Sequence, residues 1–108
     1  MMVSEFDENI YERLKRVPKG MVTTYKELAH SVGTRAYRAV GSAMRKNPLA
    51  PAVPCHRVVA SDGGIGGFKG QTKGDAIFEK IRLLEKEGIK IKDNKIVDFE
   101  KRMYRFKT

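Results

Sequence analysis

Two short helical segments that meet at Gly33 constrain the fold more than any other feature of the sequence. Thr24 and Glu27 have the spacing of a capping box, in which each side chain satisfies a backbone amide at a helix N-terminus. This spacing predicts a short helix that runs to about Ser31. Gly33 is expected to end it, because glycine readily adopts the left-handed conformation that terminates helices.

A second helix is predicted directly after this turn. Thr34 is expected to cap it, and its apolar positions recur at helical spacing, at Ala36, Val40, Ala43 and Met44. The helix must stop near Asn47, because the residue before Pro48 is pushed out of helical geometry. A helix, a tight glycine turn and another helix form the outline of a helix-turn-helix.

The remaining elements are predicted from capping residues, breakers and periodicity. The cap-like pair Ser4 and Asp7 begins a first helix that continues to the Pro18-Lys19-Gly20 stop. Later segments are expected as a strand or link at 21–23, a stiff extended stretch at 48–54, a strand at 58–60, a glycine loop at 62–70, a helix at 75–87 and a hairpin at 89–99 that turns at Asp93-Asn94. The last nine residues fit no single element. The order predicts a mostly helical α/β fold of the winged helix-turn-helix kind, and 108 residues suit a single domain over 1–108.

The charge balance favours an anionic partner. Lysine and arginine number 22 against 13 acidic residues, a net charge of +9, so nucleic acid is the first candidate and solubility the simpler explanation. One cysteine forms no internal disulfide, and one cysteine with two histidines matches no usual zinc spacing, so we expect a reducing compartment and no metal. The first ten residues lack the apolar run of a secretory signal, and no stretch approaches the roughly 20 apolar residues of a membrane span.

The candidate for chemistry is the segment Pro54-Cys55-His56-Arg57-Val58-Val59. A cysteine acts as a nucleophile only as the thiolate, and a neighbouring histidine and arginine favour that anion. In a strand, however, His56 would point away from Cys55, so productive contact needs a turn or a bridging water. On these two residues alone, a buried inert cysteine beside a satisfied histidine is the simpler interpretation.

The wider pattern resembles the C-terminal, active-site domain of the methylated-DNA–protein-cysteine methyltransferases, also called O6-alkylguanine-DNA alkyltransferases. The similarity covers about residues 6–92 and includes, besides the Pro-Cys-His-Arg-Val-Val segment, Phe6, Tyr11, Val17-Pro18-Lys19-Gly20, Thr23-Thr24-Tyr25-Lys26-Glu27-Leu28-Ala29, Arg38-Ala39-Val40-Gly41, Arg45-Lys46-Asn47-Pro48, the glycine loop and Leu83-Leu84-Glu85-Lys86-Glu87-Gly88. These motifs follow one another in family order.

The resemblance implies a catalytic role for five residues. Cys55 would accept an alkyl group from O6-alkylguanine in double-stranded DNA, His56 would act as its base through water, and Glu87 would orient His56. Tyr25 would hydrogen-bond the flipped guanine and help to protonate it, and Asn47 would tie the recognition helix to the active-site segment. The implied reaction is irreversible, happens once per protein molecule and needs no cofactor.

The resemblance also implies the DNA interface. Arg38 would enter the base stack and replace the flipped nucleotide. The other residues placed at the DNA are Thr24, Tyr25, Arg35, Arg45 and Arg57. The base pocket would be walled by Val58, Phe68 and Lys69. We expect a monomer in the cytoplasm, associated with the nucleoid.

Two departures from the family pattern keep alternatives open. We expect this protein to lack the N-terminal domain that most members carry, and Phe68-Lys69 stands where many members have Tyr-Ser. Alkyltransferase-like proteins also lack that domain but replace the cysteine, and they bind the lesion without repairing it. A non-catalytic lesion sensor is therefore the first alternative; a winged-helix transcription factor and a cysteine hydrolase are the others.

Overall fold

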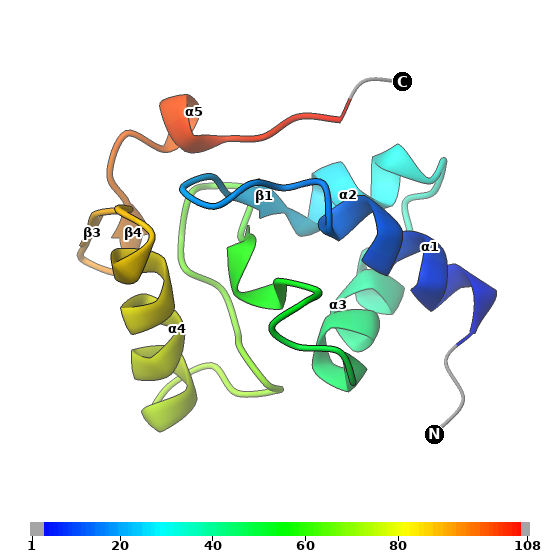
Figure 1. Ribbon diagram of the computed structural model, residues 1–108, viewed down its shortest axis with the longest axis horizontal. Coiled ribbons are helices and arrows are strands. Elements are labelled where there is room, and N and C mark those ends of the chain that lie inside the picture. Colours follow the sequence, from blue (N-terminus) through cyan, green and yellow to red (C-terminus); the bar gives the residue numbers. More distant parts are fainter. Residues whose placement is uncertain (1–3, 107–108) are drawn as a thin grey trace.

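The computed structural model describes residues 4–106, so both ends of the predicted domain 1–108 lie outside the described residues. Three helices lie together on one side of the molecule, and a fourth helix lies with a small hairpin on the other side (Figure 1). The three are α1 (Glu5–Leu14), α2 (Tyr25–Ser31) and α3 (Tyr37–Lys46). Opposite them are α4 (Asp75–Lys86) and the strands β3 (Ile91–Lys92) and β4 (Lys95–Ile96). The predicted mostly helical fold is confirmed.

Helix α1 begins with the capping box that the sequence predicts. The Ser4 hydroxyl accepts a hydrogen bond from the Asp7 amide at 3.0 Å, and the Asp7 carboxylate accepts one from the Ser4 amide at 3.3 Å. The helix ends at Leu14, earlier than the predicted stop at residues 18–20. The chain there tightens into a turn, with the Val17 amide bonded to the Leu14 carbonyl, and Val17 is still fully buried.

Helices α2 and α3 form the predicted helix-turn-helix around Gly33, which has a φ of +79°. The Thr24 hydroxyl caps α2 by accepting from the Glu27 amide at 3.0 Å. The prediction that Thr34 caps α3 is wrong. Ala36 occupies the cap position, α3 begins one residue later, and the Thr34 hydroxyl accepts instead from the Ala36 amide within the turn.

The segment 48–54 was expected to be extended, and this prediction is wrong. Residues 48–52 form turns, because the side chain of Asn47 closes this stretch at both ends. Its amide nitrogen donates to the Val53 carbonyl at 2.8 Å, and its oxygen accepts from the Leu49 amide at 3.0 Å. The closed stretch leads directly into η1 (Cys55–Arg57), a short 3₁₀ helix that the sequence analysis did not predict.

Two short β-ladders are present in the described residues. Strand β1 (Thr23–Thr24) pairs in parallel with β2 (Val58–Val59), which is one residue shorter than predicted. Strands β3 and β4 form the predicted hairpin, and its turn residues Asp93 and Asn94 both have positive φ, as tight hairpin turns require.

The C-terminal segment, left open by the sequence, docks against the first strand. Helix α5 (Phe99–Arg102) is followed by a parallel bridge between Met103 and Val22, and the Tyr104 amide donates to the Val22 carbonyl at 2.7 Å. In Figure 1 this segment runs across the molecule from the hairpin side to the helical side.

The core consists of two apolar clusters. One lies among α1, α2 and α3, with Leu14 and Leu28 at its centre; the other joins α4 and the hairpin to β2 and the loop, with Leu84 and Ile89 fully or almost fully buried. Cys55 is partly buried and packs against both clusters. The candidate nucleophile therefore lies at the seam between the two halves of the fold.

One hydrogen bond across the helical side gives a test of this packing. The Tyr11 hydroxyl donates at 2.7 Å to the Ala43 carbonyl in the last turn of α3. In a continuing helix this carbonyl would accept from the Asn47 amide, but that amide donates to the Met44 carbonyl. Tyr11 is 3% exposed. Tyr11→Phe should lower the free energy of unfolding by about 1–3 kcal/mol, because the buried carbonyl loses its partner.

Urea unfolding measures this change. Tyr37→Phe is the matched control, because Tyr37 is 40% exposed and its hydroxyl bonds only to exposed His30. The control should change stability by less than about 0.5 kcal/mol. Equal losses in the two variants would mean that the bond to Ala43 is not what stabilises the helical side.

Candidate active site

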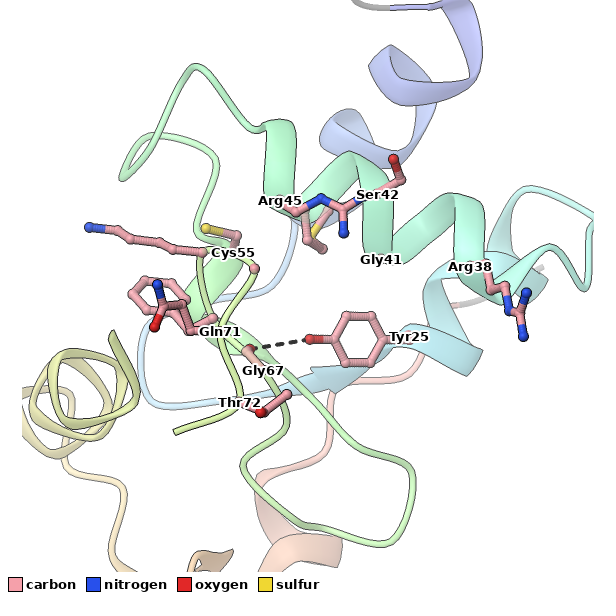
Figure 2. A pocket seen from close by; sticks show the side chains of 13 residues that line it. Tyr25, Arg38, Gly41, Ser42, Arg45, Cys55, Gly67, Gln71 and Thr72 are labelled. Atoms are coloured by element: carbon pink, nitrogen blue, oxygen red, sulfur yellow. Dashed lines mark hydrogen bonds between the residues drawn. The ribbon is translucent and has the colours of Figure 1, made fainter. Parts of the chain in front are cut away.

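A cavity of about 420 Å³ opens between α3 and the glycine loop. Figure 2 shows its lining, in which Tyr25 lies below α3 and Cys55 lies beside the end of α3 that carries Arg45. The lining residues are Tyr25, Arg38, Gly41, Ser42, Met44, Arg45, Cys55, Gly67, Phe68, Lys69, Gly70, Gln71 and Thr72. The charged members of this lining are all cations. An anionic or electron-rich ligand therefore suits the cavity.

Cys55 reaches this cavity because the chain turns sharply before it. Asn47 fixes residues 48–53, and the Cys55 amide donates to the Val53 carbonyl at 2.9 Å. In η1, successive side chains fan out over a single turn instead of alternating as in a strand. Cys55 consequently faces the cavity while His56 is buried at 5% exposure.

Behind Cys55, the carboxylate of Glu87 binds both residues that follow the cysteine. One oxygen lies 2.9 Å from His56 Nε2, and Arg57 donates to both oxygens at 2.9 and 2.8 Å. A third Arg57 nitrogen donates to the Val17 carbonyl at 2.9 Å. Burial alone would raise the pKa of Glu87, but the hydrogen bonds from Arg57 and His56 outweigh it and lower the pKa to about 2. The group is therefore a fixed negative charge.

Tyr25, the first residue of α2, forms the opposite wall of the cavity. Its hydroxyl is directed at the Gly67 carbonyl at 3.4 Å (Figure 2). Burial raises the pKa of Tyr25, and the negative charge of a Cys55 thiolate raises it further. The phenol is therefore held protonated, as a hydrogen-bond donor beside the cysteine.

The arginines of the helix-turn-helix are exposed. Arg38 and Arg45 lie at opposite ends of α3, and Figure 2 shows Arg38 pointing away at the end distant from Cys55. The stem of Arg45 packs on the loop so closely that a Cβ at Gly70 would lie 2.9 Å from its Cδ. Arg35 is exposed in the turn that precedes α3. The charges of these arginines therefore face solvent.

Two residues predicted at the DNA interface lie elsewhere. Thr24 is 1% exposed and its hydroxyl is used as the cap of α2. Arg57 is turned inward, where Glu87 and the Val17 carbonyl occupy its guanidinium. Thr24 is therefore buried in the protein interior, whereas the Arg57 side chain is 17% exposed and its guanidinium is engaged within the protein. Sequence spacing reports neither interaction.

The predicted pocket residues are divided. Phe68 and Lys69 line the cavity, whereas Val58 is fully buried behind it. The Val58 carbonyl accepts a hydrogen bond from Lys80, a residue that the sequence analysis did not single out. A signal was present, because Lys80 falls on the apolar stripe of α4 between Ile77 and Leu84.

Two classes of site are not found in residues 4–106. No group of three or more His, Cys, Asp or Glu side chains there could hold a metal ion. Within the same residues, no helix has the length and apolar character that a membrane crossing requires.

The ionised state of Glu87 predicts an acid dependence of stability. Its pKa in the folded state is about 2, below the ordinary value of 4.5, so the unfolded state binds more protons between these values. The stabilisation is present in full above pH 4.5 and is lost as the pH falls toward 2. Its upper limit is about 3 kcal/mol.

Chemical unfolding of wild type and Glu87→Gln between pH 6 and 2 measures this effect. The stability gap between the two proteins should narrow as the pH falls. Glu85→Gln, at an exposed position on the same helix, is the matched control. A gap for Glu87→Gln that stays constant to pH 2 would show that Arg57 and His56 do not hold this carboxylate ionised.

Known proteins are related to this chain in sequence and in structure. A methylated-DNA–protein-cysteine methyltransferase of Methanosarcina barkeri is 41% identical over 88 residues, which make up 81% of this chain and 54% of that protein. The chain spans about half the length of the curated relatives it matches.

Solved structures agree with this relationship. The O6-methylguanine-DNA methyltransferase of Pyrococcus kodakaraensis superposes with a TM-score of 0.68 at 48% identity, covering 80% of this chain and 47% of that one. S. pombe Atl1, in complex with damaged DNA containing O6-carboxymethylguanine, superposes with a TM-score of 0.78 at 29% identity, covering 97% and 99% of the two chains. The family model for the DNA binding domain of 6-O-methylguanine DNA methyltransferase matches residues 5–89. The chain therefore belongs to the 6-O-methylguanine DNA methyltransferase DNA-binding domain family.

Proposed function

We propose that this protein repairs DNA by transferring the alkyl group of O6-alkylguanine to Cys55, once per molecule. The observation that carries the proposal is the position of Cys55 on the cavity, with the His56–Glu87 pair directly behind it. A thiol, a histidine and an orienting carboxylate are the groups that nucleophilic catalysis by cysteine requires.

Recognition would begin with the charged surface. A net charge of +9 and the exposed arginines of the helix-turn-helix suit the phosphate backbone. A base inside a duplex cannot present its alkyl carbon to a protein thiol, so the nucleotide must be flipped into the cavity at a cost of a few kcal/mol. Arg38 would fill the vacated position in the stack and offset part of that cost.

The chemical step would use the groups around Cys55. His56, oriented by Glu87, takes the thiol proton directly or through water. The sulfur then attacks the alkyl carbon, the bond between that carbon and O6 breaks, and its electron pair stays on the guanine. Tyr25, whose raised pKa keeps it protonated, donates a proton to the leaving guanine. The thioether product has no leaving group for water to displace, so the protein is consumed.

A second candidate is binding of the lesion without transfer. The superposition with Atl1 over 97% of this chain favours it, because that protein is seen with damaged DNA. The length of the methyltransferase relatives favours neither candidate, since about half of each relative lies outside the matched region. Cys55 favours transfer, because a binding protein has no need of a nucleophile facing its cavity.

Mass spectrometry separates the two candidates. After mixing with excess O6-methylguanine duplex, the protein should gain one methyl group on Cys55 and no more. Cys55→Ser should gain none, because a hydroxyl ionises far less readily than a thiol. The variant should bind the duplex with an affinity within about twofold of wild type, since the exposed arginines are unchanged. Tight binding by the wild type with no change in mass would establish lesion binding alone.

A substitution of Arg38 tests nucleotide flipping. Arg38→Ala should slow transfer from a duplex by about tenfold or more, because extrusion of the base loses its support. Transfer from the free alkylated base, which needs no extrusion, should stay within about twofold of wild type. Arg45→Ala is the control for the loss of a positive charge on the same helix. In this variant, transfer from the duplex and transfer from the free base should fall by more similar factors than in Arg38→Ala. Equal losses on both substrates for Arg38→Ala would mean that Arg38 does not support extrusion.

A further inference from the structure

Lys80 is a fully buried cation behind the cavity. Its side chain leaves the apolar stripe of α4 at 0% exposure. The ammonium donates to three main-chain carbonyls, those of Val58 at 2.6 Å, Ile65 at 2.6 Å and Gly67 at 2.9 Å. All three acceptors are neutral, and none of the ion pairs found in residues 4–106 includes Lys80.

Such a residue is costly for folding alone. A buried charge without a countercharge loses its hydration, and an apolar side chain of the same shape is often at least as stabilising. Burial lowers the pKa of Lys80 from 10.5 to about 7. Packing of α4 therefore does not account for a lysine at this position, and the groups around the ammonium suggest another role.

The three carbonyls connect Lys80 to the cavity on two sides. Gly67 lines the cavity, and the same carbonyl that accepts from Lys80 also accepts from the Tyr25 hydroxyl at 3.4 Å. Val58 directly follows η1, which carries Cys55 and packs against α4. One ammonium thus holds the loop wall and the end of the cysteine segment together.

Lys80 also interacts with the charge of Cys55. A thiolate at Cys55 raises the pKa of Lys80, opposing the effect of burial. The two groups therefore interact electrostatically across the end of η1. His56 and Arg57 are engaged with Glu87, and Lys69 is paired with Glu79. Arg38 and Arg45 also line the cavity but are exposed to solvent, whereas Lys80 is buried and its hydrogen bonds go to neutral carbonyls.

We propose that Lys80 is a positioning residue for the transfer reaction, fixing the Gly67 wall against which Tyr25 rests and favouring the thiolate of Cys55. This inference rests on the proposed function, because the role concerns alkyl transfer. Lys80 touches neither the cysteine sulfur nor a reacting group through its hydrogen bonds, and it acts through the carbonyls and through its charge.

The test compares Lys80→Met with wild type in two measurements. Met has a similar length but no charge and no donor. Transfer from O6-methylguanine duplex should fall at least tenfold while duplex affinity stays within about twofold. In the protein without DNA, alkylation of Cys55 by iodoacetamide should slow by about threefold or more at pH 7, and its pH profile should move to higher pH.

Control variants separate this role from loss of structure. Arg82→Met removes an exposed cation from the same helix and should leave the iodoacetamide profile unchanged. Lys80→Gln keeps donors for the carbonyls but not the charge. It should recover part of the transfer rate and keep the shifted profile, and it decides the question if Lys80→Met does not fold.

The outcomes distinguish failure of this inference from failure of the proposed function. If wild type transfers no alkyl group to itself, the proposed function fails, and the iodoacetamide profiles still decide whether Lys80 acts on Cys55. Folded Lys80→Met or Lys80→Gln protein with the wild-type profile and the wild-type transfer rate would overturn the inference.

Discussion

The geometry around Cys55 depends on the hydrogen bonds that the carboxylate of Glu87 accepts. It binds His56 and Arg57 at once, and Arg57 in turn holds the Val17 carbonyl beyond the first helix. The three residues of η1 have only one turn of helix to stabilise them, so their orientation must be fixed from outside. Removing the carboxylate would leave the partly buried Arg57 guanidinium without its countercharge and His56 without the group that orients it.

Helix α4 and its C-cap residue supply opposite charges to the segment that carries Cys55. Lys80 and Glu87 are seven residues apart, which places them on the same face two turns from each other. The carboxylate of Glu87 accepts hydrogen bonds from His56 and Arg57. The ammonium of Lys80 donates to carbonyls of β2 and the loop. The seam between the two apolar clusters is therefore held by polar contacts from a single rigid element. Such contacts are directional, whereas apolar packing alone would tolerate small shifts of the cysteine.

The parts of this fold that could be predicted from the sequence are those set by local chemistry. The Thr24 cap and Gly33 predicted the helix-turn-helix, apolar periodicity and Gly88 predicted α4, and the Asp93-Asn94 turn predicted the hairpin. Each of these signals depends on residues close together in the chain. The turn at 48–53 was mistaken for an extended stretch because its conformation is set by the amide of Asn47. Lys80 and the inward place of Arg57 were missed because their partners lie 13 to 40 residues away in the chain.

The C-terminal segment bears on the same site, although it lies beyond the residues 5–89 that the family model matches. Arg102 donates to the carbonyls of Gly20 and Gly88, at 3.1 Å each, and Gly88 immediately follows Glu87. The Tyr104 amide donates to the Val22 carbonyl, so this segment also holds the residue that directly precedes β1. The position of Glu87 is consequently fixed from both sides, by Arg57 at its carboxylate and by Arg102 at the turn that ends its helix. Residues outside the matched family region can therefore influence His56 without approaching the cavity, through the backbone of a single turn.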